Sequence, residues 1–167
     1  MGGESDNLLD ATAFTHGPVT LDGAGGGGGG GAAAEVFRGA FESDLQEGEV
    51  LEQISFPAPP ENARFGHYKL KLVESSWPIA TATCVVGVGG DGTVTSARLA
   101  VGGVNTTPYL VDVSSLVGGA LDSAAAESVV EIVRAGATDP YSDVLADGDY
   151  RQQVSGVVAK RALLAVS

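Results

Sequence analysis

Two segments rich in small and β-branched residues flank the tetrapeptide GGDG at residues 89–92, and no other part of the chain restricts the fold more strongly. Residues 80–88, ATATCVVGV, place apolar side chains at every second position: Ala82, Cys84, Val86 and Val88. Residues 94–101, VTSARLAV, repeat the pattern with Ala97, Leu99 and Val101. Because strand side chains alternate between faces and Asp-Gly accepts positive φ, this stretch predicts a β-hairpin with one buried face.

The same glycines invite a second interpretation, a dinucleotide-binding loop. Residues 87–92, GVGGDG, fit the spacing G-x-G-x-x-G, and Asp112 follows about 20 residues later. That fingerprint requires a helix to begin at the glycines, so that its N-terminus meets the pyrophosphate. The residues that follow, TVTSARLAV, alternate as a strand does. The glycines are therefore predicted to form a hairpin turn.

Two further strands precede the hairpin. Residues 49–56, EVLEQISF, put Val50, Ile54 and Phe56 on one face, and the prolines of PAPP at 57–60 end the strand. Residues 65–72, FGHYKLKL, alternate more clearly. Their apolar face consists of Tyr68, Leu70 and Leu72, and their polar face of His67, Lys69 and Lys71.

The last third of the chain predicts three helices. Thr107 and Pro108 are suited to the start of the first, and Gly118-Gly119 to its end. Asp122 or Ser123 can cap the second, whose core residues are Val129, Val130 and Val133. The third, from about residue 149 to 166, has an apolar stripe: Tyr150, Val154, Val157, Val158 and Leu164. The predicted fold is α+β: an antiparallel sheet of three to four strands with three C-terminal helices packed on one face.

Composition excludes several functions. The 167 residues are 44% hydrophobic and 18% charged, as expected of one folded domain. A net charge of −12 argues against nucleic acid and against anionic membranes as partners. No apolar stretch reaches the roughly 18 to 20 residues of a membrane span. The first residues, MGGESDNLLD, lack the basic and apolar regions of a signal peptide, so a cytoplasmic protein is expected.

No complete set of catalytic or metal-binding residues is apparent. Cys84 lies on the predicted apolar face, which favours a core residue over a nucleophile. His16 and His67 are too far apart in sequence to suggest a metal pair. The seven glycines at 25–31 precede AAAEVF, which lacks the Lys-Ser or Lys-Thr of a phosphate cradle. They are predicted to form a flexible loop.

Residues 69–78 leave two interpretations open. Lys69 and Lys71 lie on the face opposite the predicted core, where lysines are commonly just solvated, although an anion or an electron-rich ring would suit the same face. The only tryptophan, Trp77, follows in a loop, and Pro78 keeps it out of helical geometry. An indole on such a loop can bury roughly 200 Å² against any flat partner.

Several segments, in order, resemble the C-terminal domain of the FAD-binding medium subunit of molybdenum hydroxylases, of the carbon monoxide dehydrogenase and xanthine dehydrogenase type. The similarity covers roughly residues 33–166. It rests on RFGHYKLKLVESSWPIATATCVV, ARLAVGGVNTTP, ATDPYSDV and DGDYRQQVSGVVAKRALLA, with EVFRGAFESDLQEGEVLEQISFPAPP upstream. The resemblance implies a part in an electron chain, in which a molybdenum cofactor in a large subunit and [2Fe-2S] clusters in a small subunit supply electrons to FAD.

The resemblance also implies two cofactor-binding residues and no catalytic or metal-binding ones. Lys69 matches a lysine that approaches the flavin, where a cation favours the anionic reduced ring. Trp77 matches an aromatic residue that covers one face of the ring in some relatives. Relatives often have aspartate before that aromatic residue, whereas this chain has Ser76.

The glycine-rich segments that hold the FAD pyrophosphate in this family have no counterpart here. Residues 1–34 resemble only the tail of the FAD domain, including a β-hairpin remnant, and residues 35–167 match the C-terminal domain. The chain alone is therefore expected to bind FAD weakly and to be inactive without a separate FAD-domain polypeptide. The alternative is a small acidic interaction or scaffold domain, or a non-functional truncated subunit without flavin.

Overall fold

The computed structural model describes residues 20–24, 31–39, 42–56 and 58–166. The N-terminal part contains β1 (Thr20–Ala24), β2 (Gly31–Ala32), α2 (Ala33–Val36), β3 (Phe37–Gly39), β4 (Glu42–Ser43) and β5 (Val50–Ser55). The remainder contains β6 (Ala63–Lys71), β7 (Pro78–Val88), β8 (Val94–Gly102), β9 (Tyr109–Val111), the 3-10 helix η1 (Ser114–Leu116), α3 (Ser123–Ser128), α4 (Val130–Gly136) and α5 (Gly148–Leu164).

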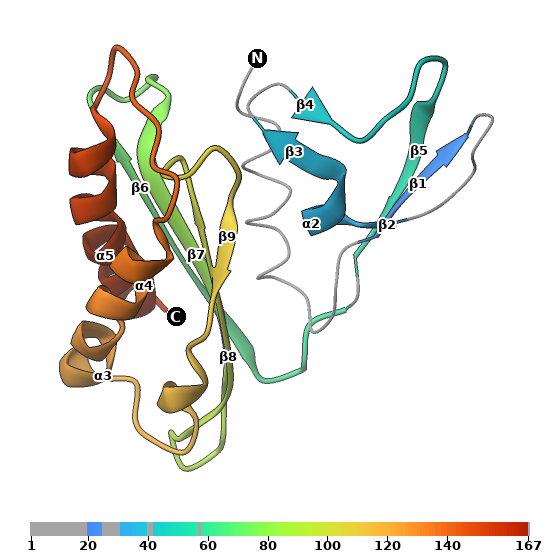
Figure 1. The fold of residues 1–167 in the computed structure, drawn as a ribbon. Helices are drawn as coiled ribbons and strands as arrows, with labels where there is room; N and C mark the ends of the chain where they lie inside the picture. Colours follow the sequence, from blue (N-terminus) through green and yellow to red (C-terminus); the bar gives the residue numbers. More distant parts are fainter. Residues whose placement is uncertain (1–19, 25–30, 40–41, 57, 167) are drawn as a thin grey trace.

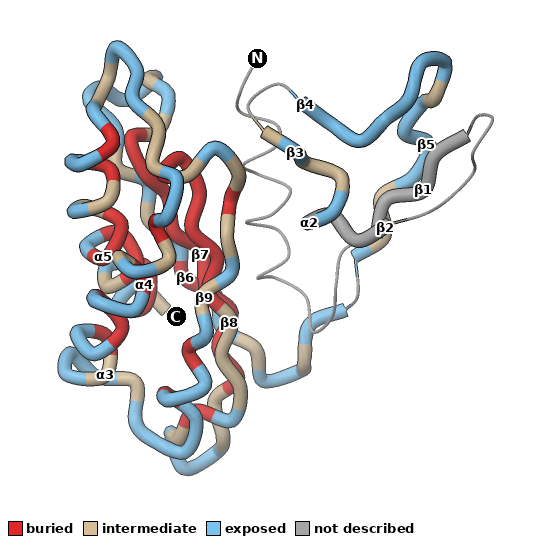
Figure 2. The backbone as a smooth tube through the Cα atoms, in the orientation of Figure 1, coloured by how far each residue is buried: buried red, intermediate tan, exposed pale blue. Residues whose placement is uncertain are grey.

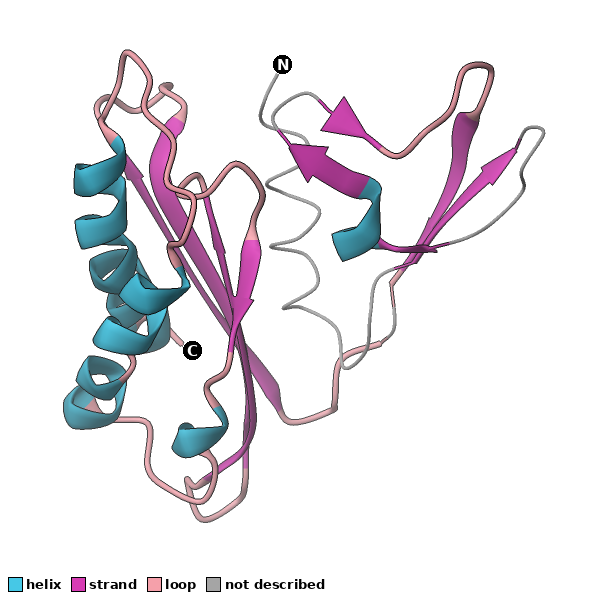
Figure 3. Cartoon of the chain, in the orientation of Figure 1, coloured by secondary structure: helices cyan, strands magenta, loops and turns pink. Residues whose placement is uncertain are grey.

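A four-stranded antiparallel sheet in the order β6-β7-β8-β9 forms one layer, and α3, α4 and α5 cover one of its faces (Figures 1 and 3). This arrangement confirms the predicted α+β class. The β7–β8 turn is the expected hairpin: the Gly89 amide donates to the Thr93 carbonyl at 2.8 Å, and Gly92 has a φ of 84°. A strand follows the glycines, so they do not form a dinucleotide-binding turn.

The core lies between this sheet and the helices, and Figure 2 shows the buried residues concentrated there. From the sheet it takes one face of β7 and β8, including Cys84, and from the helices it takes Val129 and Val133. The alternation in the two central strands therefore identified the face that lines the core beneath the helices, although β7 is buried on its other face as well. Tyr68 and Leu70 of β6 pack against the same cluster as predicted. Leu72 does not, because β6 ends at Lys71.

The helix predicted after Thr107 is wrong. The structure has β9 at Tyr109–Val111 and only a short 3-10 turn, η1, at Ser114–Leu116. Val111 pairs with Leu99 and Tyr109 with Val101. Capping signals are worth about 1 kcal/mol, whereas strand pairing also satisfies the backbone of β8. Pro108 is compatible with either element, because proline is tolerated immediately before a strand.

The other two helices exist, with one break. Asp122 caps α3, and its carboxylate accepts a hydrogen bond from the Ala125 amide at 2.8 Å. The second predicted helix is divided at Val129 into α3 and α4. The third is α5, whose predicted apolar stripe is buried only in part, and Val154 of that stripe packs against the core. Val158 is buried, whereas Tyr150, Val157 and Leu164 are exposed.

Helix α5 instead turns its small residues inward, because its backbone approaches its neighbours closely. A Cβ added to Gly66 of β6 would lie 2.0 Å from the Ala162 carbonyl oxygen of α5. A Cβ at Gly156 of α5 would lie 2.8 Å from the Val130 carbonyl oxygen. Ser155, Ala159 and Ala162 are accordingly buried. Small residues therefore occupy the points of closest approach, while larger side chains of the same helix, Arg151, Val158 and Leu163, are buried where there is room for them.

The described N-terminal elements form two small sheets, one in the order β2-β1-β5 and one of β3 with β4. The predicted strand at 49–56 is β5, but it pairs with β1, and Val50 and Phe56 are exposed. The glycines at 25–30 and most of the predicted N-terminal hairpin remnant lie outside the described residues. None of the helices in the described ranges combines the length and the apolar character that crossing a bilayer requires.

Candidate functional site

The turn between β6 and β7 carries the two residues that the resemblance selected. Strand β6 ends at Lys71 and β7 begins at Pro78, so Trp77 is the last residue of the turn. The Ser76 hydroxyl accepts hydrogen bonds from the amides of Leu72 at 3.1 Å and Val73 at 3.3 Å. It also donates to the Val73 carbonyl at 3.0 Å. Ser76 therefore closes the turn from which Trp77 extends.

The turn exposes an unusual amount of apolar surface. Leu72 is 62% exposed, Val73 is 63% exposed and Trp77 is 52% exposed. Trp77 is thus not a core residue, which removes the simplest explanation for a tryptophan at this point. Half of the indole surface is accessible to a partner, and Pro78 limits the backbone freedom of the residue that carries it.

Lys69 lies on the face of β6 opposite the helices. It is exposed and paired across the sheet with Thr81 of β7. The next pair on the same face is His67 and Thr83, and the His67 Nδ1 atom lies 2.8 Å from the Thr83 hydroxyl. Burial, and secondarily the charge of Lys69, lowers the pKa of His67, which keeps the imidazole neutral at neutral pH. No ion pair among the described residues involves Lys69, so its charge remains available.

Strand β7, which pairs with β6, is buried on the face that carries Lys69. Thr81, Thr83 and Val85 of β7 face away from the helices, and all three are buried. On β8, Ala100 packs against Val85 on the same face. Trp77 immediately precedes β7, four residues before Thr81, the cross-strand partner of Lys69. The exposed parts of the candidate site are therefore Lys69 and Trp77, and a cation together with an exposed aromatic ring can hold a planar, electron-rich group.

Cys84 points to the opposite side of β7, into the core. Burial raises the pKa of its thiol to about 12, outweighing the hydrogen bond with the Gly66 backbone. The described residues contain no group of three or more His, Cys, Asp or Glu side chains that could hold a metal ion. Cys84 is therefore a packing residue of the sheet.

This assignment predicts that Cys84 does not react in the folded protein. At pH 8 a thiol with a pKa of about 12 is almost entirely protonated, and this one is also inaccessible. Titration with a thiol reagent should give no reaction in buffer and one thiol per chain in strong denaturant. Stoichiometric labelling of the native chain would contradict the core position.

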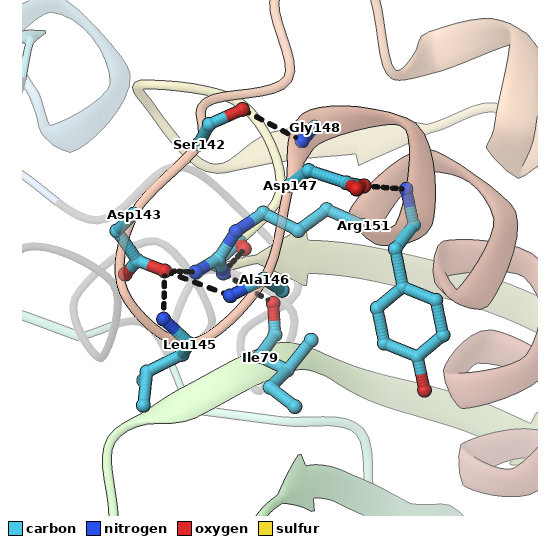
Figure 4. Close-up of polar contacts among 10 residues, drawn as sticks. Ile79, Ser142, Asp143, Leu145, Ala146, Asp147, Gly148 and Arg151 are labelled. Carbon is cyan, nitrogen blue, oxygen red and sulfur yellow. Dashed lines mark hydrogen bonds and ion pairs between the residues drawn. The ribbon is translucent and has the colours of Figure 1, made fainter.

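Arg151 forms a buried polar cluster that the sequence analysis missed (Figure 4). It is 0% exposed, and its guanidinium contacts the carbonyls of Ile79 and Gly103 and the carboxylate of Asp143. A signal was present in the sequence. Arg151 is in helical phase with Ser155, Ala159 and Ala162, the small residues that α5 buries.

These features define a two-layer α+β domain with an exposed aromatic turn beside a strand that carries a lysine. Residues 68–166 match the family model for the CO dehydrogenase flavoprotein C-terminal domain. The chain is 32% identical over 131 residues to the carbon monoxide dehydrogenase medium chain of Afipia carboxidovorans, covering 77% of this chain and 45% of that protein. It is also 32% identical over 130 residues to the medium chain of Hydrogenophaga pseudoflava, covering 76% and 44%. The chain belongs to the CO dehydrogenase flavoprotein C-terminal domain family.

Solved structures agree with this assignment. The reconstituted CO dehydrogenase of Oligotropha carboxidovorans superposes with a TM-score of 0.82 at 27% identity, covering 98% of this chain and 57% of the other. Quinoline 2-oxidoreductase of Pseudomonas putida 86 shares the fold, with a TM-score of 0.79 at 24% identity over 97% of this chain and 58% of the other. This chain spans less than half the length of the two medium chains that it matches.

Proposed function

We propose that the chain forms part of the FAD-binding subunit of a cytoplasmic molybdenum hydroxylase. In this role the β6–β7 hairpin helps to hold the flavin that passes electrons from [2Fe-2S] clusters to an acceptor. The observation that carries the proposal is an exposed Trp77 in the turn that follows the strand of Lys69, whose ammonium forms no ion pair with the described residues, in a chain that belongs to a flavoprotein family.

The exposed side chains of the β6–β7 hairpin fit a flavin. Its ring system is planar and has polar atoms along one edge, and the hairpin offers an accessible indole for the face and an ammonium for the edge. Ser76 stands where relatives often have aspartate, and here its hydroxyl is used within the turn. Ser76 is therefore assigned to the turn and not to the cofactor.

FAD supplies the redox chemistry when it is bound, and this chain supplies position and charge. Lys69 would supply a positive charge to the bound ring, which reduction makes more negative. The chain has only 9 Lys and Arg residues against 21 Asp and Glu, so few other cations could take this role. Trp77 would cover part of the bound ring and so restrict which acceptors reach it. Neutral His67 lies next to Lys69 and does not add a second charge.

The remaining parts of the complex come from other polypeptides or from further chain. The medium chains that this sequence matches are more than twice as long as the matched segment, so the pyrophosphate site is assigned to a part of the subunit outside these 167 residues. Residues 1–34 are assigned to the tail of the FAD domain and residues 35–167 to the C-terminal domain. A small subunit with [2Fe-2S] clusters and a large subunit with the molybdenum cofactor complete the proposed assembly.

A flavin-retention experiment tests this function. The chain is mixed with a separately expressed FAD domain from a medium subunit, and the flavin that remains after gel filtration is measured by absorbance. We expect retention only in the mixture, and an FAD affinity about tenfold lower in Lys69→Met, because a charge-assisted contact of ~1.4 kcal/mol is lost. Trp77→Ala should alter acceptor reactivity more than the unfolding midpoint.

Lys160→Met is the matched control, because Lys160 is a lysine on α5 whose ammonium pairs with Glu127. It should retain flavin as the unaltered chain does. If the mixture retains no flavin, or if Lys69→Met and Lys160→Met behave alike, the flavin role is wrong and the acidic interaction domain becomes the better description. Flavin bound stoichiometrically by the chain alone would contradict the separate pyrophosphate site.

A further inference from the structure

Strand β7 begins with an irregularity two residues after Trp77. Along the β6–β7 ladder Leu70 pairs with Ala80, whereas the next residue of β6, Lys71, pairs with Pro78. Ile79 is therefore the extra residue of a β-bulge. A bulge leaves its extra residue outside the ladder and bends the strand, which changes the direction of the chain on either side. Here the redirected chain is the turn that carries Trp77.

Arg151 replaces the missing strand partner at this bulge. Its Nη1 atom donates to the Ile79 carbonyl at 2.6 Å and to the Gly103 carbonyl at 2.7 Å. Gly103 follows the last residue of β8 and has a φ of 70°, so its carbonyl also lies beyond the regular ladder. One nitrogen of a helix residue thus joins the start of β7 to the end of β8, as Figure 4 shows for its contacts around Ile79.

The guanidinium is itself held from two other directions. Its Nη2 atom donates to the Asp143 carboxylate at 2.6 Å, and its carbon lies 4.1 Å from the centre of the Tyr141 ring. The Asp143 carboxylate in turn accepts hydrogen bonds from the amides of Leu145 and Ala146 (Figure 4). The loop before α5 therefore fixes the orientation of Arg151, and Arg151 fixes the bulge.

We infer that Arg151 is a positioning residue for Trp77: it locks the bulge at Ile79 and thereby sets the direction in which the aromatic turn leaves the sheet. This inference rests on the proposed flavin role of Trp77. Arg151 does not contact the candidate site directly. It acts through two backbone carbonyls and couples the turn to the loop before α5, on the far side of the sheet from Lys69.

Arginine suits this position and lysine does not. The planar fork directs one nitrogen at two carbonyls and the other at a carboxylate, while its face rests on Tyr141. A lysine ammonium concentrates its donors on one atom and lacks the flat face. A lysine would keep the positive charge but could not bond the two backbone carbonyls and the Asp143 carboxylate at the same time. Arg151→Lys is therefore the informative substitution.

The only tryptophan of the chain reports the outcome without any flavin. Acrylamide quenching and fluorescence anisotropy of Trp77 are measured in the unaltered chain, Arg151→Lys and Asp143→Ala, with far-UV circular dichroism as the check on folding. We expect Arg151→Lys to change the quenching constant at least twofold and to lower the anisotropy. Asp143→Ala should produce a smaller change in the same direction, because it removes only the support of Arg151.

Arg134→Lys is the matched control. Arg134 also bonds a carboxylate, that of Glu131, and a backbone carbonyl, that of Gln153, but it belongs to the helix layer. Its substitution should leave the Trp77 signal unchanged. An unchanged Trp77 signal in a folded Arg151→Lys chain overturns the inference. Should Arg151→Lys fail to fold, an unchanged signal in Asp143→Ala overturns it equally.

The proposed flavin role and the positioning role of Arg151 can be contradicted independently of each other. Flavin retention in the mixture of polypeptides tests the role of the site, whereas the fluorescence of the flavin-free chain tests the positioning of its tryptophan. A chain whose Trp77 responds to Arg151→Lys but that retains no flavin in the mixture contradicts the flavin role alone.

Discussion

Gly66→Ala is expected to destabilise the fold by at least ~3 kcal/mol, at the upper end of overpacking effects. The added Cβ would lie 2.0 Å from the Ala162 carbonyl oxygen, 3.0 Å from the Cys84 sulfur and 3.0 Å from a Val166 methyl carbon. The carbonyl belongs to the backbone of α5 and cannot rotate away, so the helix must separate from the sheet. Urea unfolding followed by circular dichroism measures the loss.

Gly90→Ala is the matched control for that experiment. Nothing lies within 4 Å of a Cβ built at Gly90, which belongs to the exposed β7–β8 turn. We expect its free energy of unfolding to stay within ~0.5 kcal/mol of the unaltered chain. Equal stability of the Gly66 and Gly90 variants would show that α5 does not pack directly onto β6.

Arg151→Met is expected to cost ~3 kcal/mol or more, because two backbone carbonyls lose their donor in a buried place. The methionine fills much of the space but offers no hydrogen bond. The Asp143 side chain is 35% exposed, so water can solvate its carboxylate and most of the cost comes from the carbonyls. The urea midpoint, compared with that of Arg134→Met, measures the difference. Arg134→Met should cost less than ~1 kcal/mol, because its ion pair is exposed.

The Arg151→Met deficit should also depend on pH. Burial alone would raise the pKa of Asp143, but hydrogen bonds from the Leu145 amide, Arg151 and the Ala146 amide outweigh it and hold the pKa below its usual value. The stability that a lowered carboxylate pKa contributes is present above the unfolded value and disappears as the pH falls through the folded value. The difference between the two chains should therefore shrink in acid, and a difference that grows in acid would contradict the pairing.

The central strands were predictable because their signals are local. Alternation in residues 80–88 and 94–101, with Asp-Gly between them, fixed both the hairpin and its buried face. The position of Lys69 opposite the core followed from the same alternation in β6. The exposure of Trp77 did not follow from any pattern, since a core role and a surface role predict the same local sequence.

The errors arose where partners distant in sequence decide the outcome. Tyr109–Val111 became a strand because β8 offers it an edge, although the preceding Thr-Pro suits a helix start. Tyr150, Val157 and Leu164 form an apolar stripe on α5 but remain exposed. The points where the helix approaches β6 and α4 most closely, at Gly66 and Gly156, leave no room for a larger side chain, and the apolar pattern does not reveal them.

The β7–β8 turn, the capping of α3 and the burial of Cys84 were determined by the sequence itself. Those features depend on backbone preferences and side-chain periodicity over a few residues. The inward face of α5, the bulge at Ile79 and the buried Arg151 were decided only by the tertiary structure. They depend on how closely two backbones approach and on which backbone carbonyls need a side-chain donor. Both are decided only when the helices pack on the sheet.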